Sequence, residues 1–168
     1  MDIKFENQYY STNEMLSEYV NKVLCRKMRV LGTIVSVVAL VMLFITFFDN
    51  DYILSTVFGI SLFLSAFVTI IAPLLMIRNL KESDKHIHNG KKFKTIVLFG
   101  DNITISEGSF SLTVEYAQIL KTHSLEHSYV LMFGKCNGII LSLDHFTVGT
   151  FEDFKLFIEV MSNLARSA

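Results

Sequence analysis

Two long runs without a single charged residue dominate this chain of 168 residues. Residues 30–48 and 52–77 contain no Asp, Glu, Lys, Arg or His, and only Asp49, Asn50 and Asp51 separate them. The hydrocarbon core of a bilayer is about 30 Å thick and takes about 20 apolar residues in a helix, so both runs are long enough to cross it. A buried hairpin in a soluble core is the alternative, but such helices normally carry a polar stripe, which neither run has. The sequence therefore predicts a transmembrane helical hairpin with a short acidic turn.

Basic residues flank the hairpin at its open end only. Both groups lie outside the apolar runs, and the turn contains no Lys or Arg: Lys22, Arg26, Lys27 and Arg29 precede the first run, and Arg78, Lys81, Lys85, Lys91, Lys92 and Lys94 follow the second. Short loops rich in Lys and Arg stay in the cytoplasm. We therefore expect a two-pass protein of the cell (inner) membrane, with both termini cytoplasmic and the turn outside.

The composition argues against transport. Charged residues make up only 18% of the chain, against about 25% in a typical globular protein. Pumps and ion pathways usually keep ionisable residues at membrane depth, and here there are none. Two helices also cannot enclose a pathway without oligomerising, so a transporter or channel is disfavoured.

Small residues and one proline mark the apolar runs. Gly32 with Ser36, and Ser55 with Gly59, have the small-xxx-small spacing that permits close helix contact. This spacing suits packing within the hairpin or a homodimer seam, and both alternatives stay open. Pro73 lacks a backbone donor, so it predicts a bend near the cytoplasmic end of the second helix, and a simple kink is favoured over a gate.

The segment before the hairpin, residues 1–28, is predicted to be cytoplasmic. It begins with a short strand around Ile3 and Phe5. Ser11 and Glu14 have the spacing of a capping box, with Ser11 as N-cap of an amphipathic helix that runs up to or into the first membrane helix. This helix can rest on anionic head groups or pack against the C-terminal domain.

After the hairpin (29–77) comes a basic juxtamembrane linker (78–92), and then a cytoplasmic domain (93–168). Alternating apolar residues predict five or so strands in that domain, with a stretch around Ile119 between the third and the fourth. Thr150 and Asp153 predict the N-terminus of a final amphipathic helix. The strands are expected near residues 93–99, 102–106, 110–114, 128–133 and 138–143, and the apolar stripe of the helix comprises Phe151, Phe154, Phe157, Ile158, Met161 and Leu164.

Antiparallel strands closed by one C-terminal helix are the layout of a pleckstrin-homology-like (PH-like) β-sandwich, which the N-terminal strand can complete. The predicted fold class is therefore an α+β membrane protein: a transmembrane hairpin carrying a cytoplasmic PH-like antiparallel β-sandwich capped by a helix.

Several stretches carry a resemblance to a known family. They are KTIVLFGDNITIS (94–106), Tyr116 with Ile119, GIILSLDHF (138–146) and FEDFKLFIEVM (151–161). Over nearly its whole length the chain resembles the YcxB-like family of small bacterial membrane proteins, which implies two membrane helices and a PH-like C-terminal domain. The family often has a Pro-Lys pair where Ser142 and Leu143 stand here. The resemblance implies no settled biochemical activity.

Few residues suggest chemistry. His86 with His88, and His123 with His127, lack further ligands at a metal-binding spacing. Asp144-His145 lacks a nucleophile in a recognisable motif, and Cys136 in its Gly-flanked turn is expected to be a reduced thiol. We therefore predict no catalytic residue, no metal and no cofactor, and an enzyme is the least favoured class.

The basic residues after the hairpin are the strongest candidate site. Arg78, Lys81, Lys85, Lys91, Lys92 and Lys94 are predicted to contact anionic lipid, although setting the topology explains the same residues. The favoured function is a non-enzymatic adaptor or regulatory protein that binds a protein partner near the inner leaflet, and the alternative is an anionic-lipid-responsive sensor. A homo-oligomer is left open, and nucleic acid is not expected because the cytoplasmic charge is balanced. The partner, the oligomeric state and the physiological process do not follow from the sequence.

Overall fold

The computed structural model describes residues 3–87 and 93–167. The chain is α+β: two long apolar helices are followed by an antiparallel β-sheet domain and a C-terminal helix. It divides into two compact units, one formed by residues 20–82 and the other by residues 1–19 together with 83–168. Each unit is described by itself.

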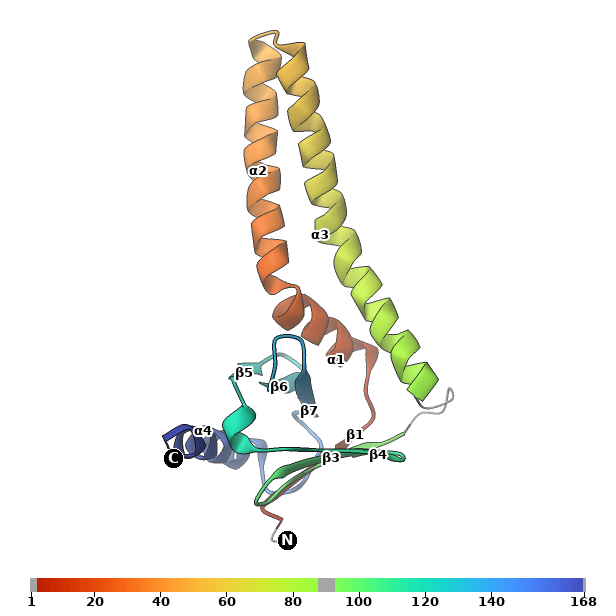
Figure 1. Cartoon of the computed structure of the whole chain (residues 1–168), viewed down its shortest axis with the longest axis vertical. Helices are drawn as coiled ribbons and strands as arrows, with labels where there is room; N and C mark the ends of the chain where they lie inside the picture. Colours follow the sequence, from red (N-terminus) through yellow and green to blue (C-terminus); the bar gives the residue numbers. More distant parts are fainter. Residues whose placement is uncertain (1–2, 88–92, 168) are drawn as a thin grey trace. The chain divides into compact units, whose positions relative to one another are not determined.

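The first unit is a helical hairpin of α2 (Arg26–Phe48) and α3 (Tyr52–Ile87) (Figure 1). Asn50 has φ of 55°, a left-handed conformation that Asn tolerates better than most residues. The Asp51 carboxylate accepts a hydrogen bond from the backbone N–H of Leu54 at 3.1 Å, which caps the start of α3. The acidic turn therefore reverses the chain and starts the second helix.

Small polar residues bring the two helices together. A Cβ added to Gly32 would lie only 2.1 Å from the Thr69 Oγ1, so any larger residue there would force the Thr69 side chain to move. The hydroxyls of Ser36 and Ser65 are 2.8 Å apart, and the Ser55 hydroxyl donates to the Thr46 Oγ1 at 3.1 Å. The small-xxx-small spacings thus contribute to packing within the hairpin.

The second helix is longer than expected. Residues 78–87, predicted to be part of the juxtamembrane linker, are the last part of α3, which also continues through Pro73. No Gly or Pro follows Pro73 until Gly90, and Arg78 pairs with Glu82 four residues on at 2.8 Å, an arrangement that supports a helix. Polarity alone therefore did not mark the end of the helix.

The second unit contains two antiparallel sheets. The five-stranded sheet has the order β4-β3-β2-β1-β8, and the three-stranded sheet has the order β5-β6-β7. The N-terminal strand β1 pairs with β2 and β8, so it does complete the sheet, as predicted. The strands are β1 (Phe5–Tyr9), β2 (Thr95–Phe99), β3 (Ile103–Glu107), β4 (Phe110–Val114), β5 (Lys121–Ser124), β6 (Ser128–Met132), β7 (Gly138–Ser142) and β8 (Phe146–Val148).

More strands follow the hairpin than predicted. Strands β5 and β8 were not assigned from the sequence, because they are short and their mixed residues show no clear alternation. A single 3₁₀ turn, η2 (Tyr116–Gln118), leads from the first sheet to the second. The Tyr116 hydroxyl donates to the carbonyl of Gly100 at 3.0 Å, which ties this turn to the β2–β3 connection.

The C-terminal helix α4 (Phe151–Ser167) packs on the core. Its predicted N-cap is confirmed: the Thr150 Oγ1 accepts from the backbone N–H of Asp153 at 3.2 Å. Phe154 and Ile158 are fully buried, but Leu164 is 61% exposed, so its assignment to the apolar stripe was wrong. At 100° per residue, Leu164 points about 80° away from Phe154, and Ala165 packs against the core instead.

The N-terminal helix differs from its prediction in two respects. Helix α1 (Asn13–Glu18) has Thr12 as its N-cap, not Ser11, because the Thr12 Oγ1 accepts from the Met15 N–H at 3.2 Å. A π-helical stretch, η1 (Tyr19–Leu24), follows it. The helix therefore does not run into α2 as one regular α-helix.

Candidate functional site

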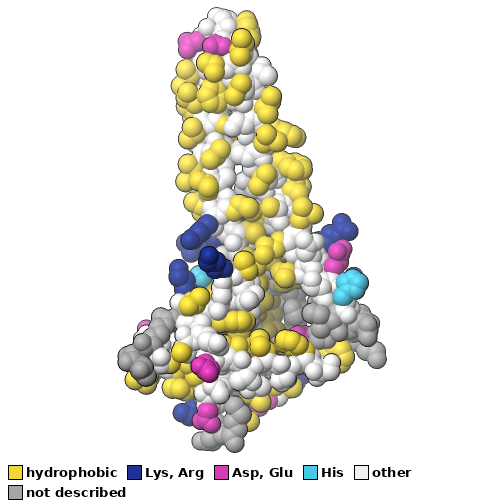
Figure 2. Space-filling model, viewed as in Figure 1, with side chains coloured by type: hydrophobic (Ala, Val, Ile, Leu, Met, Phe, Trp, Pro, Cys, Tyr) yellow, Lys and Arg dark blue, Asp and Glu magenta, His cyan; other side chains and the backbone are white. Residues whose placement is uncertain are grey.

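The hairpin carries a charge-free apolar surface between two polar ends. Figure 2 shows yellow side chains along the helices, magenta acidic ones at the tip and dark-blue basic ones at the opposite end. Large side chains such as Phe48, Ile53 and Phe63 are 77%, 80% and 68% exposed. Both helices are long and apolar enough to cross a membrane. An exposed apolar surface of this extent indicates a function that involves lipid or another protein.

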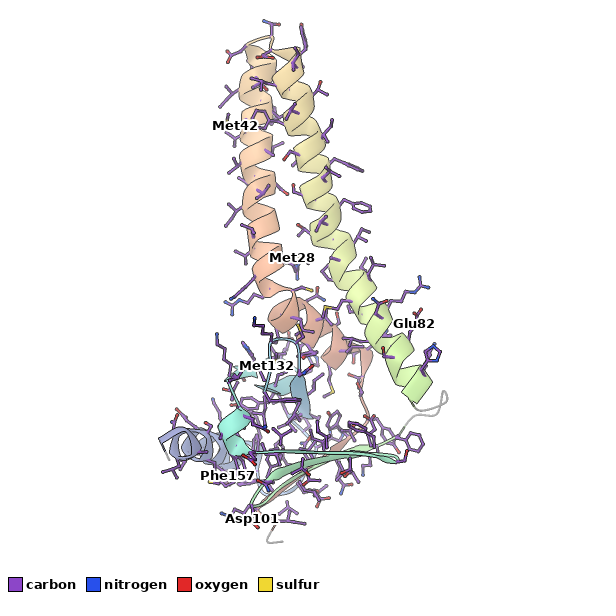
Figure 3. The ribbon with its side chains drawn as sticks, in the orientation of Figure 1. Met28, Met42, Glu82, Asp101, Met132 and Phe157 are labelled. Carbon is purple, nitrogen blue, oxygen red and sulfur yellow. The ribbon has the colours of Figure 1, made fainter. Side chains whose placement is uncertain are left out.

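The described members of the predicted lipid-binding set belong to two parts of the chain, the end of α3 and the residue before β2. Arg78, Lys81 and Lys85 lie on the last turns of α3, at a spacing that places them near one face of a helix. Arg78 is paired with Glu82, which is labelled in Figure 3. This pairing offsets part of the positive charge.

The remaining residues of that set lie beyond α3. Lys94 precedes β2, and its ammonium group donates to the Gln8 Oε1 at 2.6 Å. Lys91 and Lys92 lie outside the described residues. Lys81 and Lys85 thus lie on α3 with Arg78.

An open apolar groove of about 550 Å³ runs between α2 and α3. Its lining is almost entirely apolar and includes Leu31, Val35, Ile60, Leu64 and Val68. Such a lining suits an acyl chain and offers little to a polar substrate.

Glu18, at the end of α1, is the centre of a polar cluster among the described residues of the second unit. Its carboxylate accepts from the backbone N–H groups of Glu126 and His127, at 3.2 and 3.0 Å, and from the Ser128 hydroxyl at 3.4 Å. The His127 Nδ1 lies 3.6 Å from the same carboxylate. One side chain thus holds the N-terminal helix to the β5–β6 turn, an interaction that no local sequence signal predicts.

The structure places His123 and His127 on different elements. His123 lies on β5, while His127 lies in the following turn and groups with Glu18 and Glu126, whose possible ligand atoms are within 4.8 Å of one another. The oxygens of Glu18 already accept backbone hydrogen bonds, so a structural role explains this group. His88, the second member of the other pair, lies outside the described part of the chain.

Ser142 and His145 come closest to a catalytic pair among the described residues. The Ser142 Oγ and the His145 Nδ1 share a hydrogen bond of 2.7 Å. Ser142 is only 5% exposed, so its hydroxyl is not accessible to a substrate. The pair instead stabilises the turn between β7 and β8, and Asp144-His145 gains no catalytic partner from it.

Tyr19 connects the end of α1 to the β6–β7 turn. Its hydroxyl donates to the carbonyl of Cys136 at 3.0 Å. Burial, with a smaller contribution from Cys136, raises the pKa of Tyr19 to about 12, so the hydroxyl keeps its proton and the hydrogen bond near neutral pH. The Cys136 side chain itself is exposed.

The outer side of α4 presents an apolar ridge, formed by Leu156, Val160 and Leu164. These side chains are 66%, 56% and 61% exposed. They recur every fourth residue, so they lie along one side of the helix. The spacing of these three residues is visible in the sequence, but it was not recognised as a separate surface because the core-facing stripe of the same helix has more apolar residues. Exposed apolar side chains in a contiguous row mark a surface that suits a partner.

The chain matches no family model, no curated protein and no solved structure.

Proposed function

We propose that this chain is a non-enzymatic adaptor or regulatory protein of YcxB-like type, anchored in the cell membrane by α2 and α3. In this proposal both termini are cytoplasmic, and the β-sheet unit is a PH-like domain that binds a protein near the inner leaflet. The exposed, charge-free surface of the hairpin carries the proposal, because lipid is the medium in which such a surface is stable. The basic flanks support the orientation.

The exposed thiol of Cys136 provides a direct test of this placement. A membrane-impermeant maleimide should modify Cys136 only after cells are opened, because the β-sheet unit faces the cytoplasm. In a Cys136→Ser background, Asn50→Cys at the tip of the hairpin should react in intact cells. The chain should also stay in the membrane pellet after alkaline extraction. Labelling of Cys136 in intact cells, or release of the chain at alkaline pH, would refute the placement.

The ridge on α4 supports a protein partner. Leu156, Val160 and Leu164 extend over two turns of one helix, which suits an apolar helix or strand of another protein. The polar residues beside them, Lys155 and Glu159, give the ridge a polar rim, as in transient protein interfaces.

A photo-crosslinking amino acid at position 160 should capture this partner. In native membranes the full chain should give one discrete protein adduct, and the same probe at position 48, in the hairpin tip, should not. Leu156→Lys with Leu164→Lys should remove most of the adduct without unfolding the chain, since both side chains are exposed. An adduct with lipid only, or one that survives both substitutions, would contradict a protein partner at this ridge.

A lipid-responsive sensor is the alternative, supported by Lys81 and Lys85 on α3. The sensor would be favoured if the yield of the position-160 adduct changed with the anionic lipid content of the membrane. The double variant Lys81→Gln with Lys85→Gln should then lose this dependence on lipid. The full chain is needed for this comparison, because a fragment that begins near residue 90 lacks β1, a central strand of the larger sheet.

A further inference from the structure

The two sheets end in four edge strands, and three of these are protected in the described residues. Strand β8 has only three residues, and its pairing with β1 is shifted between Glu6 and Asn7. Strand β5 begins with Lys121 and is mostly polar. Short strands, irregular pairing and charges are the usual means by which proteins prevent edge-to-edge association.

The third protected edge is β7, where side chains of β1 contact the backbone. Asn7 donates to the Ser142 carbonyl at 2.8 Å and accepts from the Ser142 N–H at 3.1 Å. The Tyr9 hydroxyl donates to the carbonyl of Ile140. A new strand therefore cannot pair with β7 without breaking these hydrogen bonds.

The fourth edge, β4, has none of these protections. Its sequence, FSLTV, contains no charge and no proline, and all five residues pair regularly with β3 without a bulge. Phe110 is 49% exposed, and Ser111 and Thr113 are exposed as well. No described strand pairs with the outer side of β4.

The turn before β4 determines which backbone groups point outward. Gly108, with φ of 59°, occupies the first central position of a two-residue turn, as in a type II′ hairpin. Glu107 and Phe110, which flank the turn, then form a hydrogen-bonded pair. Because such pairs alternate along an antiparallel ladder, the N–H and C=O groups of Ser111 and Thr113 point away from β3.

We propose that β4 is a self-association edge, to which β4 of a second copy adds antiparallel about a two-fold axis at Leu112. This register places Ser111 opposite Thr113 of the copy, so the outward backbone groups of both strands meet. Phe110 then lies opposite Val114 of the copy, so no charged residue enters the five new cross-strand pairs. Glu107 and Glu115 do not face their own copies, so the axis brings no like charges together.

Because the edge of β4 is complementary to itself in this register, we infer that the strand that pairs with it is β4 of a second copy. One surface serves both protomers, as a two-fold interface requires. This inference goes beyond the proposed function and does not depend on it, since the edge is a property of the sheet. Loss of the partner at the α4 ridge would leave the pairing of β4 intact, and the reverse also holds.

Charge-pair variants of the full chain test the pairing. We expect wild-type protein to form a dimer at rising concentration in detergent, as measured by energy transfer between labelled copies. Ser111→Lys with Thr113→Lys should be monomeric, and so should Ser111→Glu with Thr113→Glu, because like charges face each other across the axis. An equimolar mixture of the two variants should regain the dimer, which also shows that both are folded.

A cysteine at the axis provides an independent readout. In a background of Cys25→Ala and Cys136→Ser, Leu112→Cys should form an intermolecular disulfide on oxidation. Directly opposed residues of a non-hydrogen-bonded pair have Cα atoms about 4.5 Å apart, within the range for a disulfide. Thr104→Cys, one strand further in on β3, is the matched control and should not crosslink.

Three results would overturn the inference. They are a wild-type chain that stays monomeric at every concentration, charged variants that dimerise as the wild type does, and a crosslink of Leu112→Cys no stronger than that of Thr104→Cys. Capture of β4 by a different protein in membranes, with no copy-to-copy crosslink, would likewise count against self-association.

Discussion

Replacing Phe154 with alanine should lower the free energy of unfolding of the β-sheet unit by about 3–5 kcal/mol, the range for truncating a large buried aromatic side chain. Phe154 is fully buried. Its ring centroid lies 4.6 Å from that of Phe99 on β2 and 5.1 Å from that of Phe146 on β8. It also lies 6.1 Å from Tyr129 on β6, in the other sheet. One side chain of α4 therefore contacts both sheets, and its removal leaves a cavity between them.

Urea unfolding of the full chain in detergent, followed by near-ultraviolet circular dichroism, measures this loss. The chain has no Trp, so the signal comes from Tyr and Phe, and buried rings such as Tyr116 and Tyr129 report on the β-sheet unit. Leu156→Ala is the matched control on the same helix, because that side chain is 66% exposed. It should change stability by no more than about 0.5 kcal/mol. Equal losses in the two variants would show that Phe154 does not join the sheets.

The aromatic cluster around Phe154 also explains why the C-terminal helix was predictable. Phe157, labelled in Figure 3, contacts Phe5 at 5.1 Å and Tyr116 at 5.8 Å between ring centroids. The helix buries a continuous stripe of apolar side chains, and these residues recur in the sequence at the spacing of an α-helix. Leu164 was misassigned because its apolar character alone does not show whether it lies in the core-facing stripe or in the exposed ridge that borders it.

Local signals located some strands closely. For β4, the predicted and observed bounds agree, because Gly108 marks the turn and the alternation is clear. The position of β1 in the sheet had no comparable signal. Its partner β2 is about 90 residues away in sequence, so its pairing depends on the tertiary fold.

The candidate sites were less predictable than the fold. Basic residues near an apolar run are easy to find, and the spacing of Arg78 and Glu82 is local, but the sequence did not indicate that Lys94 binds Gln8, which lies 86 residues away. That β4 is an edge strand could not be predicted from the sequence, because only the strand order shows which strands lack a neighbour. The protection of β7 by Asn7 likewise depends on two segments that are 135 residues apart.

Asn7→Leu should destabilise the β-sheet unit by about 2–6 kcal/mol, although leucine is nearly isosteric and more apolar. Asn7 is fully buried, and its amide makes both hydrogen bonds to the backbone of Ser142. Leucine leaves the N–H and C=O groups of Ser142 buried without partners, at about 1–3 kcal/mol for each. The same urea titration by near-ultraviolet circular dichroism measures the effect.

Two further variants separate this hydrogen-bond effect from packing. Gln8→Leu, on the neighbouring residue of β1, should cost only about 1 kcal/mol, because this half-buried side chain loses its hydrogen bonds to Lys94 and Glu6 but leaves no buried backbone group without a partner. Asn7→Asp should recover part of the stability at acid pH, where a protonated carboxyl can donate to the Ser142 carbonyl. It should lose that stability towards neutral pH, where the carboxylate repels the same oxygen. If Asn7→Leu were as stable as the wild type, the link between β1 and β7 would not hold the two sheets together, and the protection of the β7 edge would need another cause.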